Sequence, residues 1–196
     1  MKVRVRVAGA AAALVLGVGA AGCGSSGGSG GAGSSDRPVL AADRARTQLQ
    51  ELVDGTTGAL TPAVRSADDA FRSVPHEGGL SRKNDGTAQL TLRRYVLTKI
   101  AAGKQPQLLA QLRAYWKGRG YTLSDESSST AAGARTPDGL GVSVTIGVPG
   151  NVTVVADALV KDPGSTEPFG PAPSPLPTGK DGGPDTMPRF EDPAWS

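Results

Sequence analysis

The order of hydrophobic patterns along the chain predicts an α+β domain, in which an antiparallel sheet of four to five strands is packed on one face by two helices. Two segments, near residues 38–54 and 104–120, carry apolar residues at helical spacing. Several segments between residues 87 and 160 alternate apolar and polar residues, as half-buried strands do. The turn sequence Pro149-Gly150-Asn151 separates the last two alternating segments, which is typical of an antiparallel hairpin.

The start of the chain, residues 1–22, has the features of a bacterial export signal. Lys2, Arg4 and Arg6 form a basic beginning without acidic residues, and an apolar run follows over residues 7–21. This run of about 15 residues is shorter than the ~18 to 20 that cross a bilayer. We therefore expect a signal peptide rather than a permanent transmembrane helix.

Cys23 is the only cysteine, and it follows the small residues Ala20, Ala21 and Gly22, a pattern that resembles a bacterial lipobox. Such a signal implies that a diacylglyceryl group is attached to the thiol and that Cys23 becomes the first residue of the mature protein. Two or more acyl chains, at ~0.8 kcal/mol per buried CH2, anchor a protein stably. The predicted location is the outer, extracytoplasmic face of the cell membrane. The alternative is a secreted protein cleaved after Ala20.

Composition excludes several classes of function. Three of the 21 Lys and Arg lie in the signal, so 18 remain against 18 Asp and Glu. A neutral domain lacks the electrostatic footprint of a nucleic-acid binder. Because Cys23 and His76 are the only residues of their types, we expect no disulfide, no metal site built from cysteines or several histidines, and no cofactor.

Two segments that flank the predicted domain have compositions typical of disordered chain. Residues 24–37 are mostly Gly and Ser, as in flexible linkers. Residues 162–196 hold nine of the 15 prolines and almost no aliphatic residues, so we expect a disordered, extended tail. A solvated cell-wall spacer is favoured over a partner-binding tail. Residues 38–161 between them are long enough for one core and predict a single domain.

The first half of the domain contains one clear helix. Residues 38–54 begin with Pro38, which suits an early helix position, and Gly55 ends the helical pattern. Residues 60–74 fit both an amphipathic helix and short edge strands, and we favour irregular chain or short strands. Residues 75–86 are polar and rich in turn formers, so we expect a loop there.

The second half supplies most of the sheet. Residues 87–100 alternate as a strand, but Arg94 falls on the apolar face, which indicates a strand end, a bulge or a buried charge with a partner. Residues 104–120 form a helix with Pro106 in its first turn and Gly118 and Gly120 at its end. Four further strand segments follow, at residues 121–125, 131–135, 140–148 and 151–160.

Five short motifs mark the domain. They are Arg93-Arg94-Tyr95, Tyr115-Trp116-Lys117, Gly120-Tyr121, Arg135-Thr136-Pro137-Asp138-Gly139 and Gly150-Asn151-Val152-Thr153. With these motifs, residues 40–160 resemble a group of small secreted lipoproteins of high-GC actinomycetes such as Streptomyces. The resemblance implies an extracytoplasmic location and this type of fold, and it implies no activity. Several members carry domain cysteines that suggest a disulfide, which this chain lacks.

Two aromatic and basic clusters are candidate binding residues. Arg93, Arg94 and Tyr95 lie on one predicted strand, and the two guanidinium groups could hold a carboxylate or phosphate. The alternative, which we favour, is that these arginines form ion pairs with nearby Asp or Glu. Tyr115 and Trp116 could form a platform on which a peptidoglycan sugar stacks, although their helical spacing favours a place in the core.

His76 and the acidic pair Asp68-Asp69 are candidates for chemistry. His76 beside Glu77 could serve as half of an acid–base pair, but the sequence indicates neither a nucleophile nor an orienting acid, so we favour an exposed histidine. Asp68 and Asp69 lack the surrounding pattern of a calcium loop, and we expect solvated carboxylates.

These observations predict a lipid-anchored, non-enzymatic binding or scaffold module at the bacterial cell envelope. Its expected partners are the membrane, through the lipid, and a cell-wall polymer or another envelope protein, with a monomer as the default state. An envelope hydrolase that uses His76 is one alternative. A structural spacer whose tail threads the cell wall is another.

Overall fold

The computed structural model describes residues 37–78, 83–124, 127–148, 150–164 and 169–196. The predicted signal peptide, the lipidation site Cys23 and the Gly/Ser linker up to residue 36 lie outside this part of the chain. The helices are α1 (Ala42–Gly58), η2 (Ala102–Lys104) and α2 (Gln105–Gly118). The strands are β1 (Ser66–Asp68), β2 (Arg72–Gly78), β3 (Lys83–Val96), β4 (Thr122–Ser124), β5 (Ala131–Arg135), β6 (Gly141–Ile146) and β7 (Val152–Lys161).

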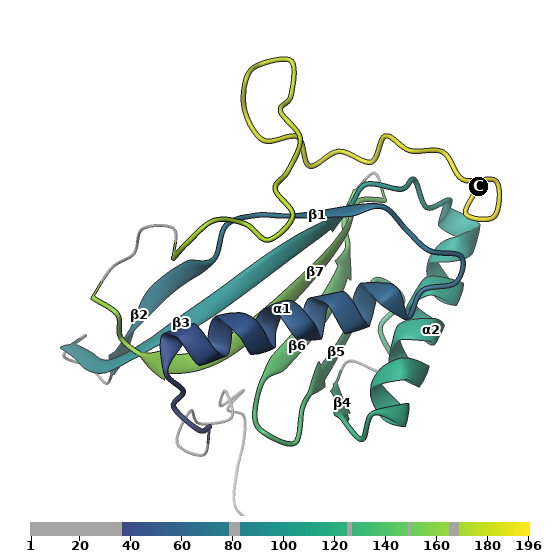
Figure 1. Ribbon diagram of the computed structural model, residues 1–196. Helices are drawn as coiled ribbons and strands as arrows, with labels where there is room; N and C mark the ends of the chain where they lie inside the picture. Colours follow the sequence, from purple (N-terminus) through teal and green to yellow (C-terminus); the bar gives the residue numbers. More distant parts are fainter. Residues whose placement is uncertain (1–36, 79–82, 125–126, 149, 165–168) are drawn as a thin grey trace, which may run out of the picture. The chain divides into compact units, whose positions relative to one another are not determined.

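The strands form one antiparallel sheet in the order β1-β3-β7-β6-β5-β4, and β2 pairs with the same edge of β3 as β1 does (Figure 1). The α+β class is therefore confirmed, with seven strands instead of four to five. β1 and β2 account for the difference. They lie where the sequence favours irregular chain, short strands or a polar loop, and the outer part of the β2–β3 hairpin buries no apolar face that would produce a visible alternation.

Both helices pack on one face of the sheet, as predicted. α1 contacts β3 and β7, and α2 contacts β4 and β5. Alternate residues of the central strands are buried beneath them, whereas Arg93 and Ser143 on the other face are exposed. The largest fully buried side chains include Leu49 of α1, Leu92 of β3 and Trp116 of α2.

The first helix starts later than residue 38, because the chain before it joins the sheet. The amide of Leu40 donates to the carbonyl of Leu159 (2.9 Å), and the amide of Lys161 donates to the carbonyl of Leu40 (3.0 Å). These bonds extend the edge of β7 where β6 has ended. At its other end, α1 continues to Gly58, one turn beyond Gly55.

None of the helices in the described residues has both the length and the apolar character needed to cross a membrane.

The prediction of a disordered C-terminal tail is wrong for residues 169–196. The amide of Asp68 in β1 donates to the carbonyl of Ser174 (2.6 Å), and the amide of Lys99 donates to that of Phe190 (2.8 Å). Trp195 is completely buried, and its Nε1 donates to the carbonyl of Pro62 (3.1 Å). The tail has few aliphatic residues, but it holds three of the chain's eight aromatic residues, which supply the apolar surface that packs against the domain.

Candidate functional site

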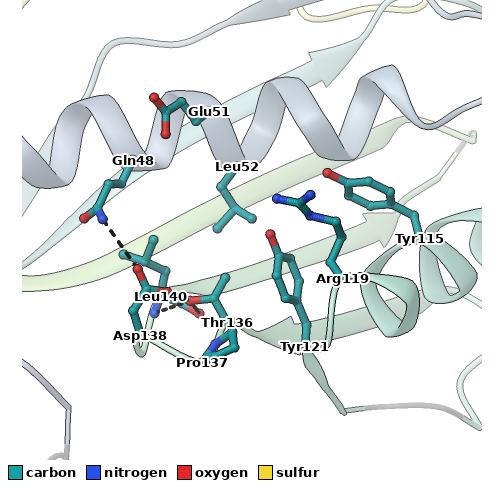
Figure 2. Close-up of a pocket in the computed structure, with 10 residues that line it drawn as sticks. All are labelled: Gln48, Glu51, Leu52, Tyr115, Arg119, Tyr121, Thr136, Pro137, Asp138 and Leu140. Carbon is teal, nitrogen blue, oxygen red and sulfur yellow. Dashed lines mark hydrogen bonds between the residues drawn. The ribbon is translucent and has the colours of Figure 1, made fainter.

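A pocket of about 350 Å³ opens between α1, the C-terminal end of α2 and the turn that joins β5 to β6 (Figure 2). α1 contributes Gln48, Glu51 and Leu52 to its wall. The α2–β4 junction contributes two tyrosines and an arginine, and the β5–β6 turn contributes residues 136–138 and 140. The pocket thus combines both signs of charge with aromatic and aliphatic surface.

The basic side of the pocket is formed by Tyr115, Arg119 and Tyr121. α2 ends at Gly118, and Gly120 with φ of 76° turns the chain into β4, a conformation that favours glycine. This turn places Tyr121 across from Tyr115, with the Arg119 side chain between them (Figure 2). Hydrogen bonding to Tyr121 raises the pKa of Arg119 above its usual value, so this guanidinium remains charged.

The hydroxyl end of Tyr115 packs against the backbone of α1 at Gly55. A Cβ atom added at Gly55 would collide with the Tyr115 hydroxyl, so the absence of a side chain at this position leaves the space that the phenol occupies. Burial raises the pKa of Tyr115, Tyr121 adds to the rise, and the positive charge of Arg119 opposes it. Tyr115 is therefore a neutral hydroxyl at neutral pH, able both to donate and to accept a hydrogen bond.

The acidic side of the pocket is formed by Glu51 and Asp138. Thr136 Oγ1 donates to Asp138 Oδ1 (2.5 Å), and Gln48 Nε2 donates to Asp138 Oδ2 (3.4 Å). The turn is closed by the amide of Gly139, which donates to the carbonyl of Thr136 (3.0 Å), as its Pro-Asp-Gly sequence predicts. Glu51 is exposed on α1. Two carboxylates and one guanidinium thus surround the same opening.

The candidate residues Arg93, Arg94 and Tyr95 do not converge. They follow one another on β3, so Arg94 points toward the helices while Arg93 and Tyr95 point to the opposite face. On that face, Arg93 Nη1 donates to the Tyr95 hydroxyl (3.4 Å). The hypothesis of one binding site built from all three residues is therefore wrong.

Arg94 is instead the centre of a buried ion cluster, which we call the Arg94 cluster (Arg94, Asp68, Asp54 and Thr57). Its Nε and Nη2 donate to the two oxygens of Asp68 (2.6 and 2.8 Å), and its Nη1 contacts Asp54 Oδ1 (2.7 Å) and Thr57 Oγ1 (3.0 Å). Burial alone would lower the pKa of Arg94, but the hydrogen bonds and charges of Asp68 and Asp54 outweigh burial and raise it. This confirms the interpretation of Arg94 as a buried charge with a partner.

Asp68 corrects the expectation of two solvated carboxylates at positions 68 and 69. Its side chain is fully buried, because Asp68 pairs directly across the strands with Arg94. Asp69, the next residue, accepts a hydrogen bond from Arg72 (3.3 Å) near the surface. β1 ends at Asp68, and Asp69 beyond it bonds to Arg72 near the surface, so only one of the two acids lies in the core.

His76 has an acidic neighbour but no site around it. Its Nδ1 lies 2.7 Å from Asp85 Oδ2 on the partly exposed β2–β3 hairpin. Hydrogen bonds from the Thr87 side chain first, and from His76 second, lower the pKa of Asp85 to about 2. The Thr87 hydroxyl donates to Asp85 (2.6 Å) rather than to His76, and His76 does not line the pocket between α1, α2 and the β5–β6 turn. The pair lacks a nucleophile within the described residues.

Trp116 and Tyr115 have separate places. Trp116 is a core residue, as favoured from its spacing, and its Nε1 donates to Thr56 Oγ1 (3.1 Å). Tyr115 pairs instead with Arg119 and Tyr121 at the pocket, a grouping that the sequence analysis missed. The signal for it is present in the sequence, because residues 115 and 119 are one helical turn apart and Gly120 redirects the chain immediately afterwards.

Within the residues that the structure describes, no group of three or more His, Cys, Asp or Glu side chains could hold a metal ion. No protein-family model, no curated protein and no solved structure matches this chain.

Proposed function

We propose that this protein is a lipid-anchored, extracytoplasmic binding module of the bacterial cell envelope, and that it takes its ligand in the pocket between α1, α2 and the β5–β6 turn. The observation that carries the binding role is the pocket itself, where Arg119, Glu51 and Asp138 surround tyrosine rings. Small-ligand sites are usually concave and carry a small number of convergent polar groups. A structural spacer needs no such concavity.

Binding without catalysis fits the side chains of the pocket. Its carboxylates and its guanidinium lie beside tyrosine and threonine hydroxyls, but no histidine or cysteine lines it. Asp138 accepts hydrogen bonds from Thr136 and Gln48, which orient its carboxylate as an acceptor for a ligand. This arrangement favours recognition over bond cleavage.

The location rests on residues 1–23 and on the resemblance to actinomycete lipoproteins. The test is expression of the full-length protein in an actinomycete host, beside the Cys23→Ala variant, with fractionation and mass analysis of the mature N-terminus. We expect membrane association and an acylated N-terminal Cys23 in the wild type, and release of the variant. Wild-type protein that is soluble and begins at Ala21 would show that the lipobox interpretation is wrong.

An envelope hydrolase that uses His76 is the second candidate, supported by the 2.7 Å contact of His76 with Asp85. The test is release of soluble fragments from purified cell walls by the wild type and by His76→Ala. Activity that disappears in the variant would establish the hydrolase and overturn the non-enzymatic role.

A further inference from the structure

The pocket also carries information about the class of its ligand. Building on the proposed binding role, we infer that the pocket binds a neutral carbohydrate, as a sugar unit held between Tyr115, Tyr121 and the β5–β6 turn.

The charges of the pocket favour a neutral ligand. Arg119 attracts an anion, but Glu51 and Asp138 at the same opening repel it. A cation meets the opposite conflict, since its attraction to the carboxylates is opposed by Arg119. A sugar hydroxyl group both donates and accepts, so it can bond to a carboxylate with its hydrogen and to a guanidinium with its oxygen. A polyhydroxylated neutral molecule therefore uses both kinds of group.

The uncharged surface of the pocket suits a ring with apolar faces. Tyr115 and Tyr121 each offer an aromatic face that ends in a hydroxyl group, and Leu52, Pro137 and Leu140 add aliphatic surface. The C–H faces of a pyranose can pack on such surface while its hydroxyl groups reach the polar rim. The volume of about 350 Å³ lies near the lower end of the range for ligand pockets, roughly 300 to 1,000 Å³, and fits a short saccharide unit.

Two of the polar side chains of the pocket are held in place before a ligand arrives. Thr136 and Gln48 fix the Asp138 carboxylate, and Gly55 leaves the space in which the Tyr115 hydroxyl lies. Side chains that are already ordered lose less conformational entropy on binding. Weak, multiple hydrogen bonds to a sugar can then add up to measurable affinity.

The chain offers a matched control on the opposite face of the sheet. Arg93 and Tyr95 form an arginine–tyrosine pair like that of Arg119 and Tyr121, but they lie on the face of β3 that is turned away from the helices. The same substitutions in the two pairs remove the same chemical groups. Only the pair at the pocket is expected to affect saccharide binding.

The experiment is calorimetric titration of the full-length protein with neutral oligosaccharides of glucose, mannose, galactose and N-acetylglucosamine. Oligogalacturonate and tripolyphosphate serve as anionic probes. We expect saturable binding of at least one neutral saccharide, weakened about tenfold by Arg119→Gln and about fivefold by Tyr121→Phe. Arg93→Gln and Tyr95→Phe are expected to leave the affinity unchanged, and thermal melts check that all four variants fold.

Three outcomes overturn the inference. The first is that none of the neutral saccharides binds. The second is that the anionic probes bind better than the neutral ones and lose affinity in Arg119→Gln, in which case the pocket is a binding site but its ligand is an anion. The third is that the Arg93 and Tyr95 variants lose binding instead. The Cys23 experiment reads location and N-terminal mass, so its outcome is independent of all three.

Discussion

Two arginines beside α1 have opposite surroundings. The side chain of Arg94 is 7% exposed, and its nitrogens bond to the buried Asp68 and Thr57 and to Asp54, whose carboxylate lies at the surface. Arg119 is exposed at the mouth of the pocket, between two tyrosines. This difference separates two roles. An arginine whose donors are satisfied within the protein stabilises the fold. An arginine that is exposed to solvent beside other polar groups is available to bind a ligand.

The largest expected effect comes from removing the guanidinium group of Arg94, the buried arginine of the two. Arg94→Leu leaves the Asp68 carboxylate buried without a counter-charge, which we expect to lower the free energy of unfolding by about 4 kcal/mol. Urea denaturation followed by circular dichroism measures this loss. The double variant Arg94→Leu with Asp68→Leu removes both charges and is expected to recover most of the stability. A single variant as stable as wild type would contradict this account of the Arg94 cluster.

The next effect concerns the tail, which lies against β1 beside the Arg94 cluster. Trp195→Ala removes a fully buried indole, so we expect a loss of about 3 kcal/mol in the free energy of unfolding. Trp195→Phe keeps most of the apolar surface and loses only the hydrogen bond from Nε1 to Pro62, and a smaller loss is expected. Both variants are measured by urea denaturation. Equal stability of wild type and Trp195→Ala would mean that the tail does not contribute to the fold.

A substitution beside the pocket is expected to change stability less than the two substitutions above and to weaken ligand binding instead. Gly55→Ala places a methyl group where the Tyr115 hydroxyl lies, so Tyr115 must swing away from α1. Alanine favours the helix over glycine by about 1 kcal/mol, which offsets the cost of this movement. We expect stability within about 1 kcal/mol of wild type but weaker saccharide binding by titration. Gly58→Ala, on the same helix with open space around its Cβ position, is the control.

The smallest effect is electrostatic and lies at the surface. Because the pKa of Asp85 is lowered to about 2, its contribution to stability is present above the usual value of 3.8 and is lost as the pH falls through about 2. Carbon-13 NMR of the Asp85 carboxyl is expected to show a midpoint near pH 2. Thr87→Val removes the largest cause and should move the midpoint upward. An unchanged midpoint in this variant would contradict the assigned cause.

The elements that could be predicted from the sequence are those whose signal lies within one segment. The helical stripe of α2 and the hairpin of β6 and β7 confirm their periodic patterns, because burial on one face imposes the period locally. Arg94 on the apolar face of β3 likewise indicated a strand end, a bulge or a buried charge, and the structure shows the last of these. Its partner could not be predicted, since Asp68 reaches it only through the register of β1 against β3.

The pocket was less accessible to sequence reasoning. Its wall joins α1 to a turn some 90 residues later, as the hydrogen bond between Gln48 and Asp138 illustrates. No local pattern encodes such a meeting. The prediction of a disordered tail was wrong for another reason. It rested on the small number of aliphatic residues and left out the apolar surface of Phe169, Phe190 and Trp195. Phe169 packs against the guanidinium of Arg46, at 5.7 Å from the ring centre, and Arg65 lies 4.4 Å from that of Phe190.

The arrangement of the sheet edges bears on how copies of the domain behave when crowded. An open edge offers unpaired backbone groups to a neighbouring molecule and so promotes aggregation. Here the tail runs along β1 and bonds to the Asp68 amide, Pro75 interrupts the outer side of β2, and the far edge, β4, is only three residues long. Copies of the domain that collide are therefore hindered from joining their sheets into a continuous ladder.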